Sequence, residues 1–297
     1  MRRTLLKCLA SACLVASLPV LAADETGATY GSGANSFALA TGSPGELGLL
    51  KALAEAFASR NDARMVWVKA GTGQSLKLLQ EGKVDMAMVH APAQVDKAVK
   101  DGWATGKTLI GSNEFYIVGP QADPAGIASA KSAAEAFRKI SQAGSPFVSR
   151  GDNSGTHQKE MQIWKNAGLQ PTGAWYIETR DFMTASLKRA NAEGAYFMSD
   201  SSTWIMEKGV APDLVVLFRG DRLLVNTYHA LVAPAGMTPG RDTAERFVAF
   251  VASPAGQKII ADYGHDRFGD GLQNDATDAR QSDRKPTLSE ERPVFRT

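Results

Sequence analysis

The stretch Phe147-Val-Ser-Arg-Gly-Asp-Asn-Ser-Gly-Thr-His157 is the most informative part of the chain. Its apolar start predicts the end of a β-strand, and the residues that follow it (Gln-Lys-Glu-Met-Gln-Ile-Trp-Lys) predict a helix. A strand–loop–helix rich in Gly, Ser and Thr presents free backbone N–H groups at the positive end of a helix dipole. This is the chemistry of an anion site, and Arg150 would add a planar charged fork. The alternative is an ordinary capped helix after a turn.

Two further loops have the same character. Thr41-Gly42-Ser43-Pro44-Gly45 follows one strand-like run, and Gly71-Thr72-Gly73-Gln74 follows another. Each precedes a segment with helical spacing of apolar residues. The carboxyl ends of parallel strands meet at one edge of a sheet, where open α/β sheets bind ligands. Three such loops therefore predict one shared anion site.

The rest of the chain alternates strand-like and helical segments, which indicates an α/β protein of mainly parallel sheets flanked by helices. Strands are expected at 37–40, 65–68, 84–89, 115–118, 196–198, 215–218 and 224–232. Helices are expected at 49–57, 75–80, 95–99, 133–140, 159–167, 184–192, 244–251 and 256–262.

The length favours two lobes joined by a hinge of two strands. The extended segments 113–120 and 223–234 are candidates for crossing between the lobes, and such a hinge allows closure around a ligand. The first lobe would then contain about residues 35–115 and 228–268, and the second about residues 119–224.

The amino terminus has the pattern of a cleaved signal peptide, residues 1–22, with a basic start and a short apolar run. Both cysteines, Cys8 and Cys13, lie in it, so the mature chain has no disulfide and no thiolate metal site. Lipid attachment at Cys13 is the less favoured alternative, because Ala-Ser-Ala before it is a poor match. These features predict export to a periplasm.

Removing the signal leaves 30 basic and 31 acidic residues, a formal charge of −1. This balance gives no indication of nucleic-acid or membrane-surface binding. Residues 269–297 are polar with sparse apolar residues, so a flexible tail is expected. Docking of this tail through Val294 and Phe295 is an alternative.

The sequence contains no pattern that indicates catalysis or metal binding. Its histidines are far apart, without metal-ligand spacing: His90, His157, His229 and His265. His90 ends a strand and is expected to be a packed histidine. There is no nucleophile elbow and no Walker motif, so we expect no enzyme activity, no cofactor and no metal cation.

Several motifs together resemble the tungstate-binding proteins of bacterial ABC importers. They are Gly71-Thr-Gly-Gln74, Asp85-Met-Ala-Met-Val-His90, Asn113-Glu-Phe-Tyr-Ile-Val-Gly-Pro120 and Ser149-Arg-Gly-Asp-Asn-Ser-Gly-Thr-His157. The resemblance runs from about Ser36 to Phe268 and implies a two-lobed, type II periplasmic binding protein. It implies that one small oxyanion is held between the lobes and handed to a membrane permease.

The resemblance also implies which residues hold the oxyanion. They are Arg150, Ser154, Gly155 and Thr156 on one lobe, and Thr41, Ser43 and Thr72 on the other, with Gly42, Gly73 and Asp152 as supports. The first loop departs from the family pattern Thr-Thr-Thr-Ser, because this chain has Ala40-Thr-Gly-Ser-Pro44 and lacks two hydroxyls. This departure leaves the identity of the anion open.

We therefore expect a monomeric, soluble receptor of an ABC importer that binds tungstate first and molybdate second. A receptor for phosphate or another protonated anion is an alternative, for which Asp152 would be the acceptor. Asp152 is expected instead to pair with Arg150 or to cap the next helix. The sequence also leaves open a ligand sensor and, less favoured, a periplasmic hydrolase on the same fold.

Overall fold

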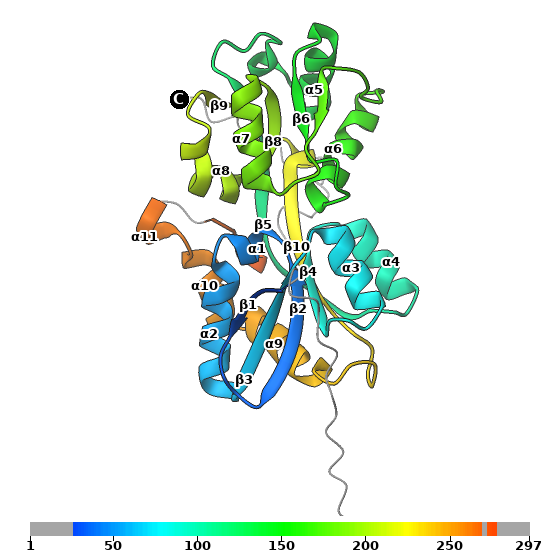
Figure 1. Cartoon of the computed structure of the whole chain (residues 1–297), viewed down its shortest axis with the longest axis vertical. Helices are drawn as coiled ribbons and strands as arrows, with labels where there is room; N and C mark the ends of the chain where they lie inside the picture. The colour runs from blue at the N-terminus through cyan, green and yellow to red at the C-terminus, as the bar shows by residue number, and fades with distance from the viewer. Residues whose placement is uncertain (1–25, 269–271, 278–297) are drawn as a thin grey trace, which may run out of the picture.

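The computed structural model describes residues 26–268 and 272–277. In Figure 1 the chain forms two lobes, and strands β5 (Thr105–Pro120) and β10 (Val225–Val232) pass between them. The expected signal peptide lies outside the described residues. Within the described part of the chain, no helix is both long enough and apolar enough to cross a membrane.

The first lobe is built on a sheet in which β2 (Asn35–Thr41) has two parallel neighbours, β3 (Ala63–Lys69) and β4 (Met86–Val89). Strand β1 (Thr26–Tyr30) pairs antiparallel with β3 at the edge. The helices of this part are α1 (Ser43–Glu46), α2 (Leu49–Asn61), α3 (Thr72–Gln80), α4 (Pro92–Lys100), α9 (Arg241–Ala252), α10 (Pro254–Asp262) and α11 (His265–Phe268).

Helices cover both faces of the first sheet. Because side chains alternate along a strand, Phe37 and Leu39 of β2 join one apolar cluster and Ala40 joins another. In the first cluster the Phe37, Phe57 and Phe247 rings pack with centroids 5.3 to 6.2 Å apart. The strand is therefore fixed on both sides, and its carboxyl end points toward the second lobe.

The second lobe has a parallel trio at its centre, with β6 (Phe147–Ser149) between β7 (Tyr176–Glu178) and β8 (Tyr196–Asp200). Strand β9 (Leu214–Phe218) pairs with β5. The helices here are α5 (Ala133–Ala143), α6 (Gly155–Asn166), α7 (Met183–Glu193) and α8 (Ser201–Glu207), with short 3-10 turns η1 (Ile127–Ser129), η2 (Lys208–Val210) and η3 (Arg222–Leu224).

Strand β5 takes part in both lobes. Its first half pairs antiparallel with β10, and its second half pairs antiparallel with β8 and β9. The fold is the two-lobed α/β architecture expected from the sequence, and both expected crossing segments fall on β5 and β10. The sheet is mixed rather than mainly parallel, because a chain that crosses to the second lobe and returns must run in opposite directions. The exact lobe boundaries stay a prediction.

Part of the expected flexible tail is packed against the body, which corrects that expectation for residues 272–277. Asn274 exchanges two backbone hydrogen bonds with Ser112 of β5, of 3.0 and 2.7 Å. Leu272 is 3% exposed, and Ala276 donates to Gln257. Two apolar side chains and a backbone bridge thus anchor a segment that composition alone marked as polar. Residues 269–271 and 278–297 lie outside the described residues.

Two helices begin earlier than apolar spacing indicated. Helix α3 begins at Thr72 rather than at 75, and α6 begins at Gly155 rather than at 159. The first turns of both helices consist of small and polar residues, which carry no apolar period. The two loops therefore deliver their hydroxyl residues inside a first helical turn, where backbone N–H groups lack intrahelical partners.

Candidate functional site

A small cavity lies between the lobes, where the loops after β2, β3 and β6 meet. Its volume is about 10 Å³, which is room for about one water-sized group. The lining residues are Thr41, Gly42, Ser43, Pro44, Gly71, Thr72, Met88, His90, Arg150, Ser154 and Phe182. In this closed arrangement the cavity excludes organic ligands of ordinary size.

Arg150 supplies the positive charge of the cavity wall and is only 4% exposed. Its Nε donates to the Asp181 carbonyl at 3.0 Å, and its Nη2 donates to Asp152 at 2.5 Å. The guanidinium also lies over the Phe182 ring, 5.3 Å from its centre. These contacts fix the fork and leave its Nη1 group with no protein acceptor among the described residues. Nη1 is therefore available to donate to an anion.

The amino terminus of α6 adds backbone donors beside Arg150. Ser154 is the N-cap, and its Oγ accepts a hydrogen bond from His157 N at 3.3 Å. Because that oxygen accepts, the Ser154 hydroxyl hydrogen can point into the cavity. Asp152 accepts from Ser154 N at 3.0 Å, so this carboxylate orders the loop and pairs with Arg150. Asp152 is thus engaged in the pairing expected from the sequence.

The amino terminus of α3 supplies donors from the other lobe. Gly71 is the N-cap, and Thr72 is the first helical residue, 4% exposed. Thr72 Oγ1 accepts from His90 N at 3.5 Å, so its hydroxyl hydrogen is free to donate elsewhere. A neutral hydroxyl beside a helix N-terminus is a suitable partner for an ionised oxygen.

In the loop after β2, the Thr41 side chain is not available to a ligand, and Gly42 and Ser43 line the cavity instead. The Thr41 hydroxyl donates to the Met88 carbonyl at 2.9 Å, and the Thr41 carbonyl accepts from Trp67 Nε1 at 2.9 Å. The Thr41 side chain therefore joins neighbouring strands. Gly42 and Ser43 line the cavity, and Ser43 begins the short helix α1.

Glycines allow the lobes to approach closely around the cavity. A methyl group on Gly155 would lie 2.5 Å from the His90 ring, and one on Gly73 would lie 2.9 Å from the Asn153 carbonyl oxygen. At Gly71 the nearest atom would be Ser154 Cβ, at 3.4 Å. Any side chain at the first two positions would hold the lobes apart. These glycines are therefore required for the closed arrangement rather than for ligand contact.

The structure brings most of the expected site residues together but places Thr156 differently. Thr156 is buried, and its hydroxyl points to the Met183 sulfur at 3.6 Å, outside the cavity lining. The phase of α6 turns this side chain toward the core of the second lobe. Gly73 and Gly155 lie at the interface between the lobes, and Asp152 lies behind Arg150.

Sequence reasoning missed His90 and Phe182 as cavity residues. His90 is packed, as expected, since its ring stacks on Tyr228 and Nδ1 bonds to Asn226, but it also lines the cavity at the end of β4. Its position at the carboxyl end of a strand, like the three loops, is the signal that could have revealed it. Phe182 precedes α7 and follows no recognisable motif. Burial lowers the pKa of His90 to about 4, so the ring is neutral at neutral pH.

The buried carboxyl group of Glu160 is hydrogen-bonded to the residue that precedes the Arg150 loop. Glu160 of α6 accepts hydrogen bonds from Ser149 Oγ at 2.7 Å, Trp164 Nε1 at 3.0 Å and Tyr176 OH at 2.7 Å. Burial raises the pKa of Glu160 to about 7, although all three hydrogen bonds oppose the shift. Because Ser149 directly precedes Arg150, this network fixes the end of β6 and the start of the loop.

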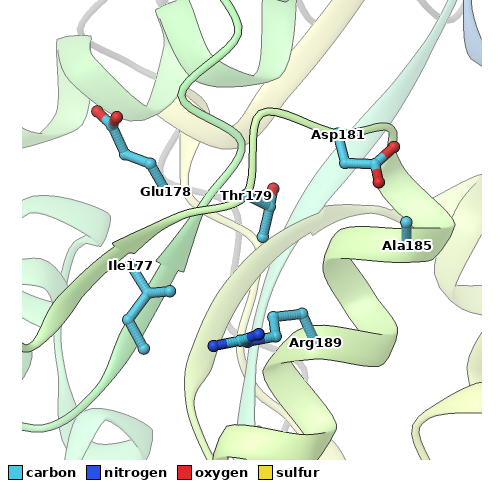
Figure 2. Close-up of a pocket in the computed structure, with 6 residues that line it drawn as sticks. All are labelled: Ile177, Glu178, Thr179, Asp181, Ala185 and Arg189. Atoms are coloured by element: carbon cyan, nitrogen blue, oxygen red, sulfur yellow. The ribbon is translucent and has the colours of Figure 1, made fainter.

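A larger hollow lies on the second lobe, shares no lining residue with the cavity, and is shown in Figure 2. It has a volume of about 280 Å³ and is lined by Ile177, Glu178, Thr179, Asp181, Ala185 and Arg189. Two of its three charged groups form ion pairs, Arg189 with Glu193 and Glu178 with Arg180. Among the described residues, no group of three or more His, Cys, Asp or Glu side chains is arranged to hold a metal ion.

Comparisons with known proteins identify the family of the chain. A family model described as "PBP superfamily domain" matches residues 23–255. A Haloferax volcanii protein named as an ABC transporter anion-binding protein is 36% identical over 224 residues. That alignment covers 73% of this chain and 66% of the relative, just under two thirds of its length.

Two relatives carry a more specific description. The tungstate-binding protein TupA of Campylobacter jejuni is 31% identical over 223 residues, which cover 73% of this chain and 82% of the relative. A solved structure of the tungstate ABC transporter from Geobacter sulfurreducens is 39% identical, with a TM-score of 0.69. It covers 78% of this chain and 100% of the solved chain.

Proposed function

The chain belongs to the PBP superfamily and, within it, to the family of tungstate-binding proteins of ABC transporters, and we propose that it is the substrate-binding receptor of an ABC importer for a tetrahedral oxyanion. Tungstate is the first ligand we propose and molybdate the second. The receptor is exported through its amino-terminal signal, acts as a monomer in the periplasm, and presents its closed form to a membrane permease.

One observation carries this proposal. A nearly fully buried Arg150 lines a small cavity between the lobes, beside which helices α3 and α6 begin. A dianion that leaves water loses strong hydration, and charged and neutral donors must replace it. Arg150, Thr72, Ser154 and the loop after β2 supply such donors from both lobes. The site binds its ligand without a reaction.

The contacts of Asp152 argue against its being the acceptor for a protonated anion. It does not line the cavity, and its two oxygens already accept from Arg150 and from Ser154 N. The relatives are binding proteins of transporters, which disfavours the hydrolase alternative. Among the described residues, no hydroxyl group is hydrogen-bonded to the His90 ring, so the cavity contains no assembled nucleophile–base pair.

The proposed mechanism is closure of two lobes around the anion. We propose lobe boundaries at residues 35–115 plus 228–268 for the first lobe and 119–224 for the second. Rotation about β5 and β10 would separate the two halves of the cavity. An anion that bridges Arg150 and Thr72 would favour the closed form, because only that form places both donors around it.

Thermal unfolding of the mature protein with tungstate, molybdate, sulfate and phosphate tests the proposal. A ligand that binds only the folded state stabilises it by RT ln(1 + [L]/Kd), about 4 kcal/mol at a thousandfold excess over Kd. We expect a clear rise in Tm with tungstate and molybdate and a smaller one with sulfate and phosphate. If no tetrahedral oxyanion at millimolar concentration moves the unfolding curve, the receptor proposal is wrong.

A further inference from the structure

His90 sits where an element of each lobe meets the cavity. It follows β4 directly, and its ring stacks on Tyr228 with centroids 4.9 Å apart. A Cβ on Gly155 of the opposite lobe would lie 2.5 to 2.7 Å from ring atoms Cε1, Nε2 and Nδ1, so Gly155 packs over the ring. Its Nδ1 lies 2.9 Å from Asn226 Oδ1. Among the described residues, the other ring nitrogen, Nε2, has no hydrogen-bond partner. The cavity wall therefore carries one polar atom whose proton state depends on the groups behind it.

A chain of hydrogen bonds behind His90 sets that proton state. The Leu272 carbonyl can only accept, so Ser202 Oγ donates to it at 2.5 Å and must itself accept from Asn113 Nδ2 at 2.9 Å. Asn113 then presents its Oδ1 to Asn226 Nδ2 at 2.7 Å. Asn226 in turn presents Oδ1 to His90, so Nδ1 carries the proton. Nε2 is left with a lone pair, on a residue that lines the cavity.

The chain is built from buried groups, which makes its direction hard to reverse. Asn113, Ser202 and Asn226 are 5%, 2% and 2% exposed. The Asp200 carboxylate, 3.4 Å from Asn113 Nδ2, reinforces the orientation of that amide. The relay starts at the docked segment 272–277 and ends at the cavity. The tautomer of His90 is thus fixed by residues from both lobes and from the carboxyl-terminal segment.

Without a ligand, the environment of His90 disfavours protonation of Nε2, which would give the ring a positive charge. Burial lowers the pKa of His90, Arg150 and Lys159 from the second lobe lower it further, and Asp152 opposes them. On the β10 side, Tyr228 is the one titratable group stacked on the ring among the described residues, and burial raises its pKa, so it stays neutral. An anion in the cavity would neutralise the effect of Arg150 and attract a proton to Nε2.

We propose that His90 Nε2 and the bound oxyanion share one proton, so that tungstate binding takes up a proton from solvent. This inference rests on the proposed function. A fully ionised oxyanion has only acceptor oxygens, and an unprotonated Nε2 beside it would place two acceptors in contact. One proton on Nε2, or equally on the facing ligand oxygen, converts that repulsion into a charge-assisted hydrogen bond. No covalent bond other than that to the proton forms or breaks.

Proton sharing would give the site a basis for selecting among anions of one shape. Tungstate and molybdate are more basic than sulfate, so they hold the shared proton more readily. Sulfate would leave Nε2 facing an acceptor without a proton, and an unpaired polar group in a closed cavity lowers affinity. His90 is therefore a specificity-determining residue, in addition to the donors that bind any tetrahedral dianion.

Calorimetric titration with sodium tungstate at pH 7, in buffers of different ionisation enthalpy, measures the protons taken up. We expect close to one proton per tungstate, and an affinity that rises by about tenfold per unit fall in pH between pH 8 and pH 6.5. His90→Gln should abolish both effects and should reduce the preference for tungstate over sulfate. His265→Gln, on the exposed helix α11, is the matched control and should behave as the wild type.

The outcomes separate this inference from the proposed function. Tungstate binding without proton uptake in the wild type, or with the same uptake in His90→Gln, overturns the role of His90 and leaves the receptor proposal standing. Failure to bind any oxyanion overturns both. If His90→Gln does not fold, nitrogen NMR of the wild-type histidines with and without tungstate decides, because His90 Nε2 must change from unprotonated to protonated or hydrogen-bonded.

Discussion

The two walls of the cavity reach the same small space by different chemistry. The wall from the second lobe holds the charge, with Arg150 locked by Asp152 and Asp181 and supported by the Glu160 network. The wall from the first lobe is neutral and consists of hydroxyls, helix N–H groups and the uncharged ring of His90. The difference indicates a division of roles. The charged wall neutralises the anion, and the neutral wall selects among anions by the hydrogen bonds that they can form.

Arg150→Ala removes the charge that distinguishes the two walls and should have the largest effect on tungstate affinity. Among the described residues, Arg150 is the one Lys or Arg side chain that lines the cavity, and its removal leaves Asp152 unpaired beside the anion. Hydrogen bonds to charged groups contribute about 1.5–3 kcal/mol each, so we expect tungstate affinity to fall by at least about a hundredfold. Titration calorimetry of the variant measures this loss, with melting curves to verify the fold.

Two further variants sharpen that result. Arg150→Lys should restore only part of the affinity, because an ammonium cannot keep the fork to Asp152 and Asp181 while it also faces the ligand. Arg189→Ala is the matched control, since Arg189 pairs with Glu193 on α7 and lines the hollow of Figure 2. Near wild-type affinity in Arg150→Ala would mean that the charge of this wall does not contact the ligand.

The second test concerns the buried support of the charged wall. The folded-state pKa of Glu160 is about 7, above its ordinary value near 4.5, so the folded protein binds this proton more tightly than the unfolded chain. The contribution to stability is therefore complete below about pH 4.5 and is lost as pH rises to about 7. The loss amounts to about 3 kcal/mol in the free energy of unfolding.

Comparison of the wild type with Glu160→Gln isolates this effect. Gln resembles the protonated acid and should remove the dependence, whereas Glu55→Gln, at an exposed site on α2, should not. The wild type must be compared with Glu160→Gln at each pH, because His90 changes the free energy of unfolding with pH in the opposite direction. Its folded-state pKa is lowered to about 4, so its contribution is present above about pH 6.5 and is lost as pH falls. Equal denaturant curves for wild type and Glu160→Gln from pH 5 to pH 8 would contradict the assignment.

The charged wall was largely predictable from the sequence, and the neutral wall was not. The Arg150 loop is one contiguous motif, so its strand end, cap and charge lie within a few residues of one another. His90 becomes a cavity residue only because β4 pairs with β10, which brings Asn226 behind the ring. That pairing joins residues more than a hundred positions apart, so local sequence patterns do not predict it. The same holds for the docking of segment 272–277 on Ser112.

Side-chain direction was a second limit of sequence reasoning. A hydroxyl in a loop identifies a potential donor, but not the acceptor that it meets. Thr156 turns to Met183 with the phase of α6, and Thr41 turns to the Met88 carbonyl of the neighbouring strand. Thr72 has a similar position in sequence, yet its hydroxyl hydrogen stays free because its oxygen accepts from His90 N. Only the three-dimensional pairing separates these cases.

The smallest expected effect distinguishes the two threonines of the neutral wall. Thr72→Val removes, from the cavity lining, a hydroxyl whose hydrogen is free to donate, so tungstate affinity should fall by about 1 kcal/mol, roughly fivefold. Thr41→Val removes a hydroxyl that donates to Met88, so it should lower the free energy of unfolding by a similar amount and change affinity less. Titration and denaturant unfolding of both variants give the two quantities independently. If Thr41→Val proves the larger loss in affinity, its hydroxyl must leave Met88 for the anion, and the neutral wall is rearranged by its ligand rather than formed in advance.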